Sequence, residues 1–75
     1  MRAKNRYRLI VRRAGSDVSA VEIVDIDAGE AVLFWDLLRR DAKTVTRMVR
    51  ADLDALDDRE FFERWASFAG DEDLR

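Results

Sequence analysis

A change of period within residues 31–56 decides the fold. This stretch reads AVLFWDLLRRDAKTVTRMVRADLDAL. It opens with a bulky apolar run typical of a strand, although leucines at 33, 37 and 38 would also suit one face of a helix. The turn composition that precedes it favours a strand over about residues 31–36. After Asp36 the apolar residues recur at steps of three and four, which predicts an amphipathic helix over about residues 38–56. That apolar stripe consists of Leu38, Ala42, Val45, Val49, Leu53 and Leu56.

Two further strands are expected before this stretch. Residues 6–13 alternate, with Tyr7, Leu9 and Val11 on one face and mostly arginines on the other. Residues 18–26 are rich in Val and Ile on both faces, which is typical of a central strand. Turn residues separate the strands, and Gly29 suits the left-handed position of a hairpin.

A second helix is expected after the first, over about residues 58–69. Asp57 followed three positions later by Glu60 fits a capping box at its start. Gly70 is expected to end it. At the start of the first helix, either Asp36 or Asp41 is a candidate cap. The inner side of the second helix is expected to carry the rings of Phe61, Phe62, Trp65 and Phe68.

The order strand, strand, strand, helix, helix predicts an α+β fold, a three-stranded antiparallel meander packed against one layer of helices as a two-layer sandwich. We expect a single small domain over residues 1–70 and a charged flexible tail over residues 71–75. The element order is similar to that of MbtH-like adenylation chaperones. Their signature, which contains proline and tryptophan, has no counterpart, because the chain contains no proline and Trp35 and Trp65 stand in other contexts.

The composition argues against most catalytic chemistries. The chain contains neither His nor Cys, so it lacks the usual general base, the commonest metal ligand and any thiolate. Residues 25–30 alternate oxygen-bearing side chains as a calcium loop does, but Gly29 falls at the fifth place, which favours a hairpin turn. We therefore expect a non-catalytic protein without cofactor or metal. Nothing in the sequence resembles an export signal or a membrane span, so a cytoplasmic location is the default expectation.

Charge is distributed unevenly along the chain. Residues 1–13 carry six positive charges and no acid, whereas residues 52–73 carry nine acids against two arginines. We therefore expect the two ends to attract each other, within one fold or between two copies.

Two basic sets are candidate contacts for nucleic acid or an acidic partner. One is on the first strand and the other forms a stripe on the first helix. The alternative is a solvated surface on which Glu22 and Asp36 pair with the arginines of the sheet, and the acidic isoelectric point favours this alternative. The two basic sets are Arg6, Arg8 and Arg12, and Arg39, Lys43, Arg47 and Arg50.

Apolar residues also fall on the sheet face that one layer of helices leaves open. We expect this face to be covered by a second copy of the chain, since exposed apolar patches on small domains mark association. The functional expectation is a small protein-interaction or regulatory module that forms a homodimer, with a nucleic-acid-binding protein as the alternative. The candidate interface consists of Ile10, Val24, Ile26, Val32 and Phe34.

Overall fold

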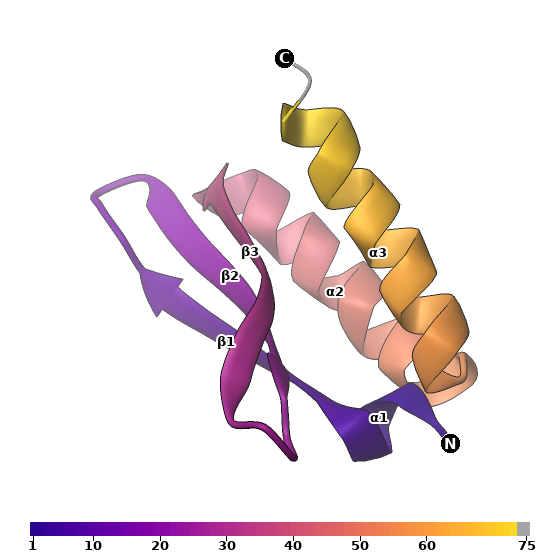
Figure 1. Ribbon diagram of the computed structural model, residues 1–75. Helices are drawn as coiled ribbons and strands as arrows, with labels where there is room; N and C mark the ends of the chain where they lie inside the picture. Colours follow the sequence, from indigo (N-terminus) through magenta and orange to yellow (C-terminus); the bar gives the residue numbers. More distant parts are fainter. Residues whose placement is uncertain (74–75) are drawn as a thin grey trace.

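The computed structural model describes the backbone of residues 1–73 and the side chains of residues 1–68. Three antiparallel strands lie in the order β1-β2-β3, and two long helices pack on one face of this sheet (Figure 1). The predicted α+β arrangement is confirmed. The elements are α1 (Ala3–Arg6), β1 (Tyr7–Arg13), β2 (Val18–Asp25), β3 (Glu30–Leu38), α2 (Arg39–Ala55) and α3 (Asp58–Asp73).

The strand register places one set of side chains beneath the helices. Val21 of β2 lies opposite Val11 and Trp35, and both Val21 and Trp35 are buried. The stripe of α2 packs onto them, with its residues from Ala42 to Leu53 buried as expected. Trp65 of α3 meets Trp35 edge to face at 6.0 Å between ring centroids, a favoured aromatic geometry.

The start of α2 differs from both predicted caps. Leu38 is the N-cap residue and has no side-chain hydrogen bond, so neither Asp36 nor Asp41 caps the helix. Instead, the Arg39 backbone N–H donates to the Asp17 carbonyl at 2.8 Å, and the Arg39 guanidinium donates to the Ser16 carbonyl at 2.7 Å. Because the turn between β1 and β2 supplies these acceptors, β3 continues directly into α2 without a loop.

The predicted hairpin between β2 and β3 is confirmed. The Asp25 carboxylate accepts hydrogen bonds from the backbone N–H groups of Asp27 and Ala28, and Gly29 has a φ of 71°. The Asp25 carboxylate therefore organises the turn. The register shifts between Ile23 and Val24, so β3 carries an extra residue, Val32, at a bulge.

The N-terminal segment was not predicted to form structure, yet it closes one end of the molecule. Ala3 of α1 is fully buried, and its N–H donates to the Leu56 carbonyl at 3.1 Å. The Asp58 N–H donates to the Met1 carbonyl at 2.9 Å. At the same corner, where α2 meets α3, Lys4 pairs with Asp54 and Arg6 with Asp58, so charges of the two ends attract each other within one fold.

The start of α3 was predicted correctly and its end was not. The Asp57 carboxylate accepts from the Glu60 N–H at 2.8 Å, as a cap does. The helix runs to Asp73, three residues past Gly70. A glycine inside a helix costs only about 1 kcal/mol relative to alanine, so it ends a helix only where the chain also turns. Of the predicted tail, residues 74–75 lie outside the described residues.

Candidate interaction site

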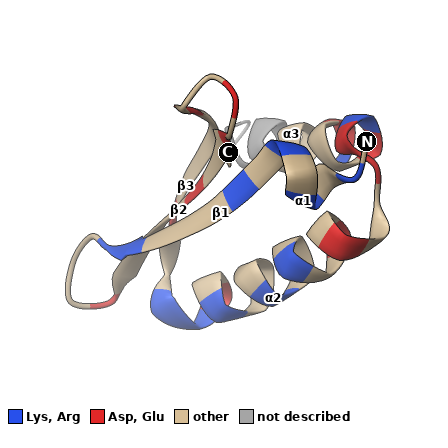
Figure 2. Ribbon diagram, turned by 90° about the horizontal axis from the view of Figure 1, so that it is seen from below, with Lys and Arg blue, Asp and Glu red and all other residues tan. Residues whose placement is uncertain are grey.

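The sheet face turned away from the helices is the first candidate site. Glu22 occupies its centre, directly between Ile10 of β1 and Phe34 of β3 in the register. No helix or strand of residues 1–73 lies over this face (Figures 1 and 2). We call it the outer face, and its residues are Arg8, Ile10, Arg12, Ala20, Glu22, Val24, Phe34 and Asp36.

Glu22 is a buried carboxylate on this open surface. It is 8% exposed and forms a hydrogen-bonded ion pair with the Arg12 guanidinium. The neighbouring side chains of Ile10 and Phe34 shield it from water, whereas Arg12 remains largely exposed. Pairing offsets the cost of removing the carboxylate from water. The centre of the outer face is therefore electrically neutral and flanked by apolar groups.

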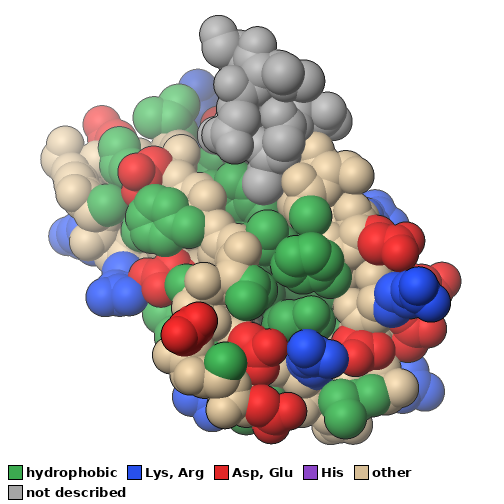
Figure 3. Space-filling model, viewed as in Figure 1, with side chains coloured by type: hydrophobic (Ala, Val, Ile, Leu, Met, Phe, Trp, Pro, Cys, Tyr) green, Lys and Arg blue, Asp and Glu red, His purple; other side chains and the backbone are tan. Residues whose placement is uncertain are grey.

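The predicted interface residues divide into three groups. Phe34 is 54% exposed, and Ile10 and Val24 are half-buried beside it on the same face. Val32 is exposed at the bulge, and Ile26 is exposed beyond the end of β2. Leu38, half exposed, was assigned to the stripe of the helix and so was missed as a surface residue. Figure 3 shows further hydrophobic side chains in a band where β3 adjoins α3.

Two of the three arginines predicted for the first strand are paired with acids, and one of these two, Arg6, ends α1 instead of lying in β1. Arg6 contacts Asp25 at 3.5 Å and Asp58 at 3.4 Å, and Arg12 contacts Glu22. Only Arg8 has no carboxylate within 4.0 Å among the described side chains. The predicted pairing with Glu22 is thus confirmed, while Asp36 forms no ion pair within residues 1–68. These contacts remove Arg6 and Arg12 as free cations.

The surroundings of Arg6 also affect ionisation. The pKa of its guanidinium is raised above the ordinary value, first by the charge of the Tyr7 phenolate and then by the Asp25 carboxylate. The pKa of Tyr7 is raised chiefly by burial of its phenol, and the nearby Arg6 charge opposes this shift. Tyr7 packs against Phe61 at 5.5 Å between centroids, so its ring belongs to the core.

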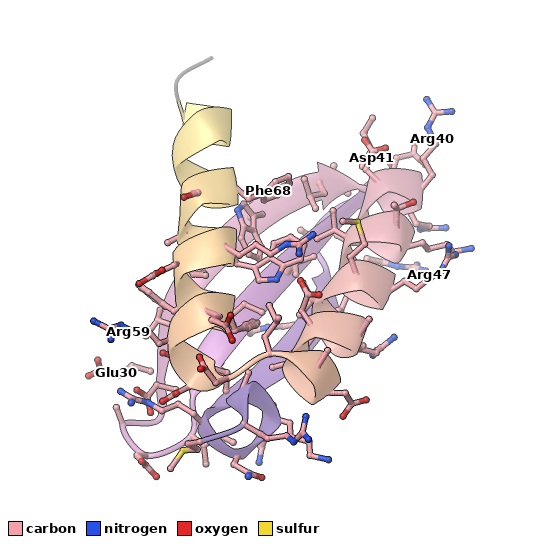
Figure 4. The ribbon with its side chains drawn as sticks, turned by 90° about the vertical axis from the view of Figure 1, so that its right-hand side faces the viewer. Glu30, Arg40, Asp41, Arg47, Arg59 and Phe68 are labelled. Carbon is pink, nitrogen blue, oxygen red and sulfur yellow. The ribbon has the colours of Figure 1, made fainter. Side chains whose placement is uncertain are left out.

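The helix cations form the second candidate site. Arg39, Lys43, Arg47 and Arg50 are all exposed along α2, and no described carboxylate lies within 4.0 Å of them. Figure 2 shows that the basic end of β1 lies beside the first turns of α2. In Figure 4, Arg40 and Arg47 project from α2 away from the sheet, while Phe68 points from α3 toward the interior. Arg40 and Arg13 were not among the predicted contacts, although both are sequence neighbours of predicted ones.

No three potential metal-ligating side chains come together among the described residues. No helix within residues 1–73 is long and apolar enough to cross a bilayer. Comparison with models of protein families, with curated proteins and with solved structures found no match.

Proposed function

We propose that this protein is a non-catalytic interaction module that forms a homodimer through its outer face. The observation that carries the proposal is the exposure of Phe34, an aromatic side chain halfway along the edge strand β3, on a sheet face with no described layer over it. Burial of such a ring contributes about 1.5–3 kcal/mol, so a covering partner is favoured. Leu38 and Val32 extend the same apolar surface along β3.

The charges of the outer face support a second copy as the partner. A twofold-symmetric interface must be complementary to itself, so each free charge needs its opposite on the same face. The outer face has one such pair, Arg8 and Asp36, since Arg12 and Glu22 neutralise each other. In the register, Arg8 lies opposite Val24 on one edge strand, and Asp36 lies opposite Ala20 on the other.

Arg8 and Asp36 therefore stand at diagonal corners of the sheet, roughly 16 Å apart from the standard strand spacing and rise. This distance excludes an ion pair within one copy. A twofold axis that lies in the interface, perpendicular to the line from Arg8 to Asp36 and through its midpoint, brings each Arg8 over the partner's Asp36. Two copies of each ion pair then surround the apolar centre, an arrangement that fixes the orientation of the two sheets.

The first test is the mass in solution by light scattering on a sizing column. The chain has a mass of 8.7 kDa, so a dimer has twice that value, 17.4 kDa. We expect Phe34→Glu to produce a monomer, because it places two buried acids in the interface. Met48→Glu is the matched control, since Met48 is 43% exposed but lies on α2 on the other side of the sheet. A monomeric wild-type chain, or equal dissociation by both variants, would refute the proposal.

Charge reversal tests the partner and its orientation. We expect Arg8→Glu alone and Asp36→Arg alone to weaken the dimer, since each places like charges opposite each other. The double variant Arg8→Glu/Asp36→Arg restores opposite charges and should recover the dimer. Failure of the double variant to recover would exclude the pairing of these two residues across the interface.

Nucleic-acid binding is the second candidate function, and one observation favours it. The cations of α2 have no described acidic partners, unlike Arg6 and Arg12 on the sheet side. Any such binding is therefore expected at α2 rather than at β1.

A further inference from the structure

Two open hollows border the first two turns of α2, one beside Asp17 of the turn between β1 and β2 and the other beside the C-terminal end of β1. One has a volume of about 400 Å³ and the other about 250 Å³, and both are lined by Arg39 and Lys43. Arg40 lines only the larger hollow, and Arg13 lines only the smaller one. We call these four cations, Arg13, Arg39, Arg40 and Lys43, the basic corner.

Within the described residues, the basic corner is not neutralised. No described carboxylate lies within 4.0 Å of its four cations, and Asp17 is the one acid that lines either hollow. The other end of the molecule differs, since there Lys4 pairs with Asp54 and Arg6 with Asp58. Clustered like charges destabilise the isolated protein and attract anions despite the overall net charge of −2.

The basic corner is also held in place by the backbone. The Arg39 guanidinium donates to the Ser16 carbonyl at 2.7 Å, and its own N–H donates to the Asp17 carbonyl. The turn between β1 and β2 therefore positions Arg39 between the two hollows. Less side-chain freedom is lost on binding when a cation is already held in this way.

The chemistry of the corner suits phosphate. Arginine presents a planar fork of donors that matches phosphate oxygens, and lysine adds a point charge. The cations continue along α2 to Arg47 and Arg50, and the helix rises about 16 Å over the eleven steps from Arg39 to Arg50. This row of cations is longer than a single phosphate group, and its length suits a chain of several phosphodiesters.

We propose that the basic corner, continued by Arg47 and Arg50, binds the phosphate backbone of single-stranded nucleic acid. A flexible strand can bend from the helix surface into the hollows, whereas a stiff duplex cannot follow that path. No aromatic side chain lines either hollow, so bases are not stacked there and binding is independent of sequence. This inference deepens the second candidate function and rests on it, but it uses different residues from the outer face, so it and the homodimer proposal fail separately.

The test uses the two lysines of the chain as a matched pair. Binding of a fluorescently labelled twelve-nucleotide single strand is followed by anisotropy at about 20 mM salt, where phosphate contacts are strong. We expect Lys43→Glu to weaken binding about tenfold or more. Lys4→Glu makes the same change in net charge at the other end, where the exposed pair with Asp54 contributes little to stability, and should weaken binding less than about twofold.

Salt dependence and competition give two further readouts. With about four phosphate contacts, the logarithm of the binding constant should fall with the logarithm of salt with a slope of about −3, and Lys43→Glu should make that slope shallower. Inorganic phosphate should compete only weakly, and a duplex of the same length should bind less tightly than the strand.

The inference would be wrong if the strand did not bind at low salt, or if the two lysine variants lost equal affinity. It would also be wrong if a duplex bound as tightly as the strand, or if inorganic phosphate competed with an affinity equal to that of the strand. Circular dichroism checks that each variant is folded, and Arg40→Glu replaces Lys43→Glu if the latter is not.

Discussion

Arg6 and Asp58 are 52 positions apart in the chain, yet the Nη1 atom of Arg6 lies 3.4 Å from the Oδ2 atom of Asp58. The same guanidinium lies 3.5 Å from the Asp25 carboxylate in the hairpin between β2 and β3. One side chain therefore connects the N-terminal segment, the hairpin and the start of α3. This contact pairs, within one copy, one of the six cations of residues 1–13 with one of the nine acids of residues 52–73.

We expect Arg6→Gln to lower the urea concentration at the unfolding midpoint and to make that midpoint less dependent on salt. Both effects follow because the substitution removes the cation that Asp25 and Asp58 share, leaving Asp58 with only the Met1 ammonium group at 4.0 Å, and because salt screens such pairs. Arg50→Gln is the control, since Arg50 is exposed on α2 and has no carboxylate within 4.0 Å among the described side chains. Equal shifts for the two variants would mean that the Arg6 contacts do not stabilise the fold.

The burial of Tyr7 predicts that the folded protein loses stability at alkaline pH. Its pKa in the folded protein is raised above the ordinary value of 10.0, chiefly by burial. Its contribution is therefore fully present below pH 10 and is lost as the pH rises through the folded pKa. The chain has a single tyrosine, so the ultraviolet absorbance of tyrosinate measures this ionisation directly.

The matched variant is Tyr7→Phe, which retains the ring and removes the ionisable hydroxyl. We expect the free energy of unfolding of the wild type, from urea titrations at pH 8 and pH 11, to fall more than that of Tyr7→Phe. An unfolding midpoint that changes equally in both proteins, or a tyrosinate midpoint below 10, would contradict the assigned burial.

The two candidate helix caps provide a third prediction. Asp57 accepts a hydrogen bond from the Glu60 N–H, whereas Asp41 makes no capping bond at the start of α2. We expect Asp57→Ala to lower the free energy of unfolding by about 1 kcal/mol. Asp41→Ala should change it by less than about 0.5 kcal/mol, as an ordinary surface substitution does. Chemical denaturation of both variants checks the difference, and a larger effect at Asp41 would be inconsistent with this cap assignment.

The two glycines in the turns between strands provide a fourth prediction. Gly29 has a φ of 71°, and a Cβ there would meet no atom within 4 Å, so strain rather than collision opposes substitution. We expect Gly29→Ala to destabilise the fold by roughly 1–2 kcal/mol. Gly15 has no positive φ, and an added Cβ would meet Val18 at an ordinary 3.7 Å. Gly15→Ala should therefore be neutral or slightly stabilising, by up to about 1 kcal/mol. Thermal melts of both variants check this difference. A lower melting temperature for Gly15→Ala than for Gly29→Ala would contradict the backbone conformations assigned to the two turns.

Apart from α1, the sequence predicted the element types and their order because these depend on local periodicity. Alternation of Tyr7, Leu9 and Val11 fits a strand, and the spacing of Ala42, Val45 and Val49 fits a helix, whatever the elements pack against. The turn at Gly29 was also predictable, since few other residues adopt its backbone conformation without strain. The expected partner of Arg12 was found because the register of adjacent strands places Glu22 close by.

Other features were decided by contacts between distant segments. The start of α2 is set by the Asp17 carbonyl, the partner of Arg6 is Asp58, and Ala3 is buried by the corner at Leu56. The basic corner exists only because the end of β1 folds beside the start of α2. By itself, then, the sequence determined the strands, the helices and the apolar stripe, because side-chain pattern and backbone preference act locally. The tertiary structure decided which charges are neutralised and which surfaces stay open, because Coulomb interactions and burial depend on distance in space rather than along the chain.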